Sequence, residues 1–265
     1  MSAPVSPLLL ERYELKYLVP LGLIEPISKH VSIYCEMDYY SKIADDHFYT
    51  INSLYLDSPR LHILQSKENA GASKFNLRIR SYGSNPRPPY FFEVKHKLHQ
   101  FIKKKRVKVY RENWDRLLTG EEPFYEDSEL VNQEYLGHFL NMVETYNAKP
   151  QILTQYRRKA YLSLIDNYAR VTFDRDLRFQ IQDNYNLTPD SQKMTHYDFP
   201  EIFGDACHNV ILELKCERKI PIWFIDLIKT FELVKINFSK FGNAMQAAYG
   251  QNDDQLFLHY ALDQS

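Results

Sequence analysis

The chain has 265 residues, enough for one large domain or two small ones, and we expect a single domain over residues 1–265. Lysine and arginine number 33 against 34 aspartates and glutamates, so the net charge of −1 gives no global reason to expect nucleic acid or an anionic membrane as partner. Three cysteines without a C-x-x-C pair argue against a disulfide framework and a zinc knuckle, and no apolar run reaches the ~18 residues of a membrane span, so we expect a cytoplasmic protein without a membrane segment.

Apolar and polar residues alternate with a period of two in eight short segments, which predicts eight β-strands. The segments are 10–19, 50–57, 75–82, 89–98, 101–110, 152–164, 168–179 and 209–217. Helical spacing occurs at 20–34, 111–118, 128–146 and 220–231, and residues 183–208 are typical of a long loop. Because closure removes exposed sheet edges, we predict an α+β fold: an eight-stranded antiparallel β-barrel with helices packed on the outside.

Nearly every predicted strand has one apolar face and one ionic face. The segment FNLRIRSYG, residues 75–83, places Arg78 and Arg80 on one side and Leu77 and Ile79 on the other. Solvated faces usually mix serine, threonine, asparagine, glutamine, glutamate and lysine, whereas arginine is prominent here. The planar guanidinium fork suits bidentate binding of phosphate. For any single strand, an apolar core with a charged exterior is the alternative.

If the ionic faces line the barrel interior, ten cations meet four carboxylates there. The cations are Arg12, Lys16, Arg78, Arg80, Lys95, Lys104, Arg106, Arg158, Arg170 and Lys215. The carboxylates are Glu14, Glu93, Asp174 and Glu213. Two like charges ~4 Å apart repel by roughly 4 kcal/mol at an effective dielectric constant near 20. Such a lumen requires water and a strongly anionic guest, and a chain of phosphates fits that description.

The same four carboxylates are candidate ligands for Mg²⁺ or Mn²⁺, because these ions prefer hard oxygen donors and bridge phosphate oxygens. Glu14 and Glu213, each two residues before a lysine, are the better candidates. The alternative is that all four only pair with neighbouring lysines and arginines.

Seven motifs in order resemble the VTC domain, the polyphosphate polymerase domain of the vacuolar transporter chaperone complex. They are ELKY (14–17), LRIRSYG (77–83), FFEVKHK (91–97), YRRKAY (156–161), ARVTFDRDL (169–177), LELK (212–215) and FSKFGNAM (238–245). The resemblance covers about residues 9 to 246. It implies membership of the triphosphate tunnel metalloenzymes, whose eight-stranded antiparallel barrel binds triphosphate in its lumen.

The resemblance also implies roles for individual residues. The residues expected to grip phosphate and act in catalysis are Lys16, Arg78, Arg80, Lys95, Arg158 and Arg170, with Glu213 on the metal. The resemblance adds Lys67 and Lys240 as substrate contacts, and the ionic strand faces add Arg12, Lys104, Arg106 and Lys215. Arg12 stands where the superfamily's usual E-x-E-x-K signature has its first glutamate. A site short of one carboxylate is less suited to two-metal hydrolysis, which favours the VTC branch.

The predicted function is therefore metal-dependent transfer of the γ-phosphate of ATP to a growing inorganic polyphosphate chain, with Mn²⁺ or Mg²⁺ as cofactor. A tripolyphosphatase or nucleoside triphosphatase on the same fold is one alternative, and a non-catalytic polyphosphate-binding module is another. The basic run at 95–106 could contact nucleic acid. Nucleic-acid-binding segments usually interleave stacking aromatic residues with such charges, and here only Phe101 does so. We expect no nucleic-acid partner, and a separate membrane partner is left open.

Overall fold

Eight long strands form one antiparallel sheet in the computed structural model, which describes residues 13–66, 74–98, 101–121, 130–198, 210–217 and 219–250. The strands are β1 (Tyr13–Val19), β3 (Tyr49–Asp57), β4 (Lys74–Tyr82), β5 (Tyr90–Leu98), β6 (Phe101–Val109), β7 (Lys149–Ser163), β8 (Ala169–Ile181) and β10 (Val210–Cys216). Their order across the sheet is β1-β10-β8-β7-β3-β4-β5-β6. All eight predicted strands are confirmed. Two short strands, β2 (Cys35–Met37) and β9 (Thr195–His196), pair with β7 and β8 and were not predicted.

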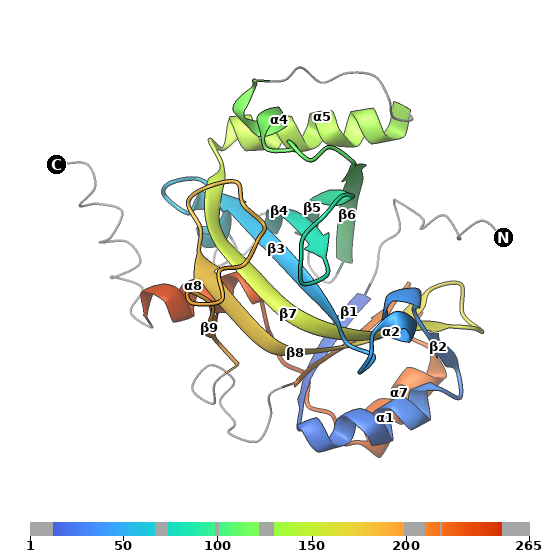
Figure 1. Cartoon of the computed structure of the whole chain (residues 1–265). Helices are drawn as coiled ribbons and strands as arrows, with labels where there is room; N and C mark the ends of the chain where they lie inside the picture. The colour runs from blue at the N-terminus through green and yellow to red at the C-terminus, as the bar shows by residue number, and fades with distance from the viewer. Residues whose placement is uncertain are drawn as a thin grey trace.

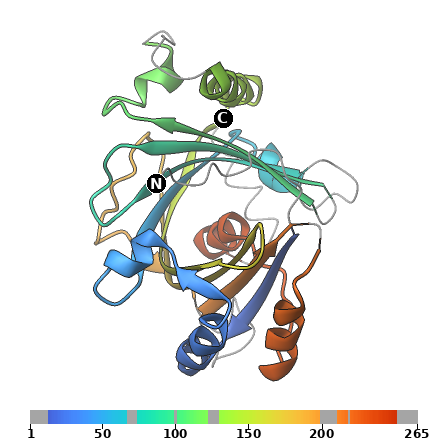
Figure 2. The ribbon, with the colours of Figure 1, turned by 90° about the vertical axis from the view of Figure 1, so that its right-hand side faces the viewer.

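The sheet curls into a barrel whose first and last strands are not joined by backbone hydrogen bonds within the described ranges (Figures 1 and 2). The two ends of the strand order, β1 and β6, approach each other, but no hydrogen-bonded ladder joins them within the described ranges. Lys95 of β5 instead bridges to Glu14 of β1, with 2.8 Å between Nζ and Oε2. The predicted closure is thus made by side chains, whereas all other neighbouring strands are joined through their backbones.

Helices cover the apolar outer face of the sheet, as the sequence predicts. On one side α5 (Leu130–Thr145) packs Phe139 and Val143 against Phe92 and Val107. On the other side α1 (Ile24–Val31) and α7 (Ile222–Thr230) cover β1, β8 and β10, and Trp223 is buried there. Burial of these faces stabilises the fold by about 25 cal/mol per Å² removed from water. The interior is thereby left to the opposite, charged faces.

The shorter helices are η1 (Leu21–Leu23), α2 (Tyr39–Ile43), α3 (His62–Gln65) and α4 (Arg116–Thr119). The helix expected at 111–118 is reduced to α4, which ends at Gly120 in a left-handed conformation with φ 74°. Of the loop predicted over residues 183–208, residues 183–194 are irregular, Thr195–His196 form β9, and residues 199–208 lie outside the described ranges. No helix in the described ranges has the length and apolar character that crossing a bilayer requires.

A last helix, α8 (Lys240–Tyr249), lies inside the curl of the sheet (Figure 2) and was not predicted as a helix. Ser239 caps it by accepting a hydrogen bond from the Gly242 amide. Phe241 stacks on Tyr55 with 4.9 Å between ring centroids, and Met245 is fully buried in the same cluster. Part of the barrel interior is therefore apolar and filled by α8, a feature that the pattern of ionic strand faces does not predict.

The cover formed by α5 is tested by Phe139→Ala, which removes a ring 5.0 Å from that of Phe92. We expect the free energy of unfolding to fall by roughly 3–5 kcal/mol, because truncating a buried aromatic leaves a cavity. Glu144→Ala, at an exposed position of the same helix, is the matched control and should change it by less than about 0.5 kcal/mol. Urea unfolding gives both values, and equal losses would contradict this packing role.

Candidate functional site

The charged faces of the strands point into the curl, where they pair across neighbouring strands. Lys16 lies opposite Glu213, and Arg158 lies opposite Asp174 in the strand registers. Residues directly opposite on antiparallel strands share a face, so each pair places both charges in the interior. The alternative of an apolar centre with these charges outside does not describe this protein.

Glu93 of β5 is the first of two carboxylates that gather several cations. Its side chain is fully buried. The groups around it are Arg78 Nε at 2.6 Å, Lys104 Nζ at 2.5 Å, Arg106 Nε at 3.2 Å and Arg80 Nη1 at 4.0 Å. Burial alone would raise the pKa of the Glu93 carboxyl, but Lys104 and the arginines outweigh it and hold that pKa well below its usual value. Glu93 is therefore ionised, and its negative charge is shared among the four cations.

Glu213 of β10 is the second such carboxylate. Its partners are Lys215 at 2.5 Å, Arg158 and Lys240 at 3.1 Å each, and Lys16 at 3.8 Å. The same cations outweigh burial and hold the pKa of Glu213 well below its usual value. Because four cations share one carboxylate, none of them is fully neutralised by it.

Asp174 and Glu14 complete this half of the cluster. Asp174 accepts two hydrogen bonds of 2.6 Å from the Arg158 fork and pairs with Lys240 at 2.6 Å. Glu14 pairs with Lys95 at 2.8 Å and with Lys16 at 3.5 Å. Burial opposes ionisation of both carboxyls, but these cations lower both pKa values.

Phenol hydroxyls orient two of the arginines. Tyr55 Oη accepts a hydrogen bond from Arg78 Nη1, and Tyr156 Oη accepts one from Arg80 Nη2, each at 3.2 Å. Ser53 Oγ accepts from Arg80 Nε at 3.2 Å. Tyr55 and Ser53 were not predicted as site residues. The alternation in TINSLYLD places both on the face opposite Leu54, and that is the signal that could have found them.

The predicted residues are brought together, with two outside the described ranges. Arg12 and Lys67 fall in the parts of the chain that the structure does not describe. Arg170 was predicted, but its partners were not: Asp38 Oδ2 lies at 2.8 Å and Tyr49 Oη at 3.3 Å. Lys240, which only the resemblance indicated, is 7% exposed inside the barrel.

The charges in this cluster do not balance. The described cations are Lys16, Arg78, Arg80, Lys95, Lys104, Arg106, Arg158, Arg170, Lys215 and Lys240, ten in all. The carboxylates paired with them are Glu14, Asp38, Glu93, Asp174 and Glu213, five in all. A half-buried excess of cations of this size is suited to a polyanion.

A family model for the VTC domain matches residues 11–249. The chain belongs to the VTC domain family. The resemblance drawn from the sequence motifs is thus confirmed over almost the same range. A search of curated protein sequences finds no match.

Several solved structures are similar to this VTC domain at low identity. One is a candidate adenylate cyclase from Bacillus halodurans, with 11% identity over 86% of this chain and 93% of that chain and a TM-score of 0.46. A Pyrococcus horikoshii OT3 protein has 10% identity over 89% and 99%, with a TM-score of 0.42. A candidate adenylyl cyclase from Hippeastrum, described as having a dominant triphosphatase activity, has 13% identity over 89% and 96%, with a TM-score of 0.45.

The VTC tunnel offers a divalent cation two carboxylates. Among the described residues, no group of three or more acidic, histidine or cysteine side chains is arranged to hold a metal. Lys16 Nζ, however, lies 3.5 Å from Glu14 and 3.8 Å from Glu213, so the two carboxylates border the same space. Mg²⁺ is commonly held by one or two carboxylates while substrate phosphates and water supply the other ligands. Glu14 and Glu213 fit that mode.

The ionic cluster is tested by Lys240→Met, which keeps the length of the side chain and removes its ammonium. We expect the free energy of unfolding to fall by about 3 kcal/mol, because Asp174 and Glu213 then lose a buried partner. Lys235→Met, at an exposed position, is the control and should change it by less than about 0.5 kcal/mol. Chemical unfolding measures both values. A gain in stability for Lys240→Met would contradict this expectation, because it would mean that repulsion among the cations exceeds the attraction of Lys240 to Asp174 and Glu213.

Anion binding in the tunnel should weaken as the pH rises through about 8, because burial lowers the pKa of Lys215 to about 8 despite the nearby Glu213. Lys215 is then charged below that pH and neutral above it. Calorimetric titration with inorganic tripolyphosphate at pH 7 and pH 9.5 measures the change, and we expect a loss of about tenfold. In Lys215→Met the tripolyphosphate still titrates but residue 215 does not, so this variant is the matched control. Equal pH profiles for the two proteins would contradict this assignment.

Proposed function

We propose that this VTC domain is a metal-dependent polyphosphate polymerase that transfers the γ-phosphate of ATP to the end of an inorganic polyphosphate chain inside the tunnel. The observation that carries the proposal is the excess of ten cations over five carboxylates in the lumen. Buried positive charge without a counter-ion is costly, so the interior favours a ligand with several negative charges along its length. Membership of the VTC family supports the same chemistry.

The arginines provide a rigid binding surface for phosphate. Arg80 and Arg158 are about 5% and 6% exposed and are already oriented by Tyr156 and Asp174. Preorganised donors need little reorganisation when the substrate binds, and their effect is strengthened where water is excluded. These guanidinium groups would contact the phosphate oxygens, while the lysines around Glu213 add charge that is less strictly oriented.

The transfer itself requires alignment and charge neutralisation. A terminal oxygen of the acceptor chain forms a bond to the γ-phosphorus, the bond from that phosphorus to the β–γ bridging oxygen breaks, and ADP leaves with the electron pair. The attacking oxygen is already an anion at neutral pH, so no side chain has to act as general base. The cations of the lumen suppress the repulsion between the two anionic reactants.

Glu213 and Glu14 would hold Mn²⁺ or Mg²⁺ together with phosphate oxygens. When bound, such an ion supplies further neutralisation of the charge on the transferring group. Glu93 takes no part in this proposal for the metal, because among the described residues none of its four cations also pairs with a second carboxylate, as Lys16 does with Glu14 and Glu213.

The purified protein supplied with ATP and Mn²⁺ should produce ADP and long polyphosphate, which gel electrophoresis resolves by length. Release of orthophosphate alone would instead identify a tripolyphosphatase or nucleoside triphosphatase. Retention of polyphosphate without any product would identify a binding module. Arg80→Met should lower the rate of synthesis by on the order of 10²–10³-fold, the cost of losing one preorganised donor to the developing charge.

Lys103→Met is the matched control for this experiment. Lys103 is exposed on β6 and alternates with the inward-facing Lys104, so it lies on the outer side of the same strand. Its replacement removes one positive charge from the protein without removing one from the lumen. We expect synthesis within about twofold of the wild type, and equal losses in both variants would contradict the location of the reaction.

A further inference from the structure

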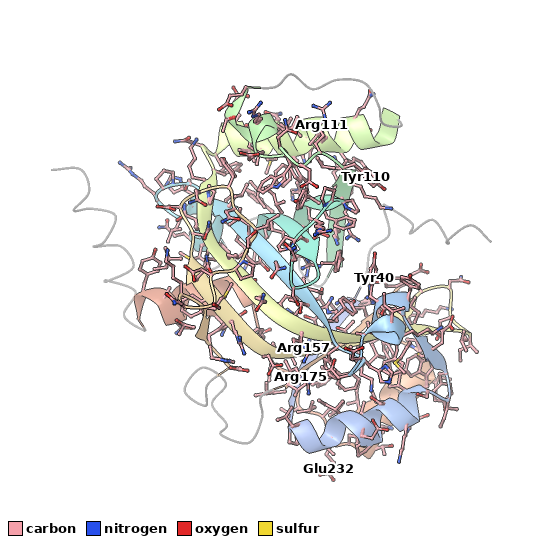
Figure 3. All side chains as sticks on the ribbon, viewed as in Figure 1. Tyr40, Tyr110, Arg111, Arg157, Arg175 and Glu232 are labelled. Atoms are coloured by element: carbon pink, nitrogen blue, oxygen red, sulfur yellow. The ribbon has the colours of Figure 1, made fainter. Side chains whose placement is uncertain are left out.

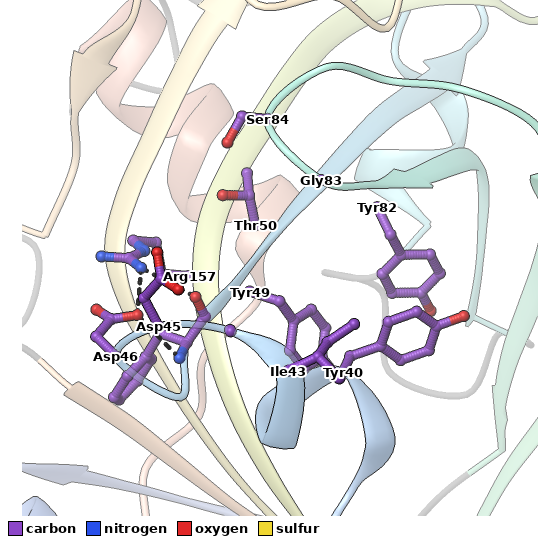
Figure 4. A pocket seen from close by; sticks show the side chains of 12 residues that line it. Tyr40, Ile43, Asp45, Asp46, Tyr49, Thr50, Tyr82, Gly83, Ser84 and Arg157 are labelled. Atoms are coloured by element: carbon purple, nitrogen blue, oxygen red, sulfur yellow. Dashed lines mark hydrogen bonds and ion pairs between the residues drawn. The ribbon is translucent and has the colours of Figure 1, made fainter.

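A pocket of about 460 Å³ lies beside the barrel rim where β3 begins and β4 ends (Figure 4). Its lining comes from α2, the segment after it, β3, β4 and Arg157 of β7; the aromatic part consists of Tyr40, Phe48, Tyr49 and Tyr82. The volume lies within the ~300–1,000 Å³ typical of small-molecule sites. None of the ten tunnel cations lines it, so the pocket is distinct from the phosphate-binding surface.

Tyrosine rings form one wall of the pocket. Tyr40 and Tyr82 stack with 5.3 Å between ring centroids and 7° between planes, and Tyr49 lies 5.5 Å from Tyr40. Tyr40 is 44% exposed. A flat aromatic wall that is partly open to solvent is the surface on which nucleobases stack, and it tolerates different bases because each has a π-face.

The same tyrosines connect the pocket to the tunnel. Tyr49 Oη accepts a hydrogen bond of 3.3 Å from Arg170, and Tyr82 Oη accepts one of 2.9 Å from Arg106. The Nε atom of Arg170 is buried and has no hydrogen-bond partner among the described residues, whereas Arg106 Nε is ion-paired with Glu93 at 3.2 Å. Two guanidinium groups therefore contact the tyrosines of the pocket wall, and that of Arg170 retains a buried donor unpaired within the described part of the chain.

The other wall of the pocket carries no excess of positive charge, because Arg157, its one lining cation among the described residues, is paired with Asp46. Asp45 and Asp46 line it, and Asp46 is engaged by Arg157 at 2.6 Å and by Arg175 at 2.9 Å. Thr50 and Ser84 add hydroxyl groups. Carboxylates repel an inorganic phosphate chain, whereas they and the hydroxyls accept hydrogen bonds from ribose hydroxyls or from a base. The pocket thus combines stacking with polar groups for a nucleoside.

We infer that this pocket binds the nucleoside part of the nucleoside triphosphate, with the phosphates directed past Arg170 and Arg106 into the tunnel. The inference rests on the proposed function, because it assumes that the triphosphate occupies the lumen. It adds residues that distinguish a nucleotide from inorganic polyphosphate. The phosphate-binding surface alone does not make that distinction, since both ligands present the same oxygens to it.

The test compares two ligands in Tyr40→Ala by isothermal titration calorimetry: the ATP analogue with an imido β–γ bridge, and inorganic tripolyphosphate. Affinity for the analogue should fall by on the order of tenfold, the effect of losing one stacking ring. Affinity for tripolyphosphate should stay within twofold. Tyr40→Phe keeps the ring and should bind both ligands as the wild type does.

Tyr110→Ala is the control for loss of an exposed tyrosine. Tyr110 is 68% exposed, does not line the pocket, and lies apart from Tyr40 in Figure 3. Binding of both ligands should be unchanged in this variant. An analogue affinity that does not change in Tyr40→Ala, or an equal loss for the two ligands, would overturn the inference. Failure of the wild type to bind tripolyphosphate would overturn the proposed function instead.

Discussion

Two buried carboxylates that each gather four cations are the interaction on which the rest of this structure depends. Glu93 and Glu213 allow guanidinium and ammonium groups to face the inside of a barrel. Without such partners, the cost of removing these charges from water would disfavour that orientation. Sharing leaves each cation incompletely neutralised. The shared pairing therefore offsets part of the cost of burying the cations and still leaves the interior positive. The helices on the outside cover the opposite, apolar faces of the same strands.

The strands and the orientation of their charged faces could be predicted because both follow from a period of two. Once Leu77 and Ile79 are assigned to a helix-covered outer face, Arg78 and Arg80 have only the interior left to them. Strand pairing is not encoded in this local pattern, so the partnership of Lys95 with Glu14, 81 positions apart, could not be derived from it. The same holds for Arg170 and Asp38, which are 132 positions apart.

The position of α8 shows another limit of pattern reading. Its sequence, KFGNAMQAAY, carries one lysine and two amide side chains among apolar and small residues, which is also typical of a surface helix packed on a sheet. Placement inside the curl depends on the shape of a cavity that the whole barrel creates. Lys240 therefore could be assigned to the tunnel only through the family resemblance, and the tyrosine wall around Tyr40 depends similarly on contacts between three separate elements.

The junction of β1 with β6 has a mechanical consequence. A barrel in which every neighbouring strand is joined by its backbone has a fixed girth, because widening it would break a whole row of hydrogen bonds. Here the ammonium of Lys95 spans the gap to Glu14, and a polyanion bound in the lumen would compete for that ammonium. Widening the barrel at this junction would therefore break side-chain contacts and leave the backbone ladders of the sheet intact.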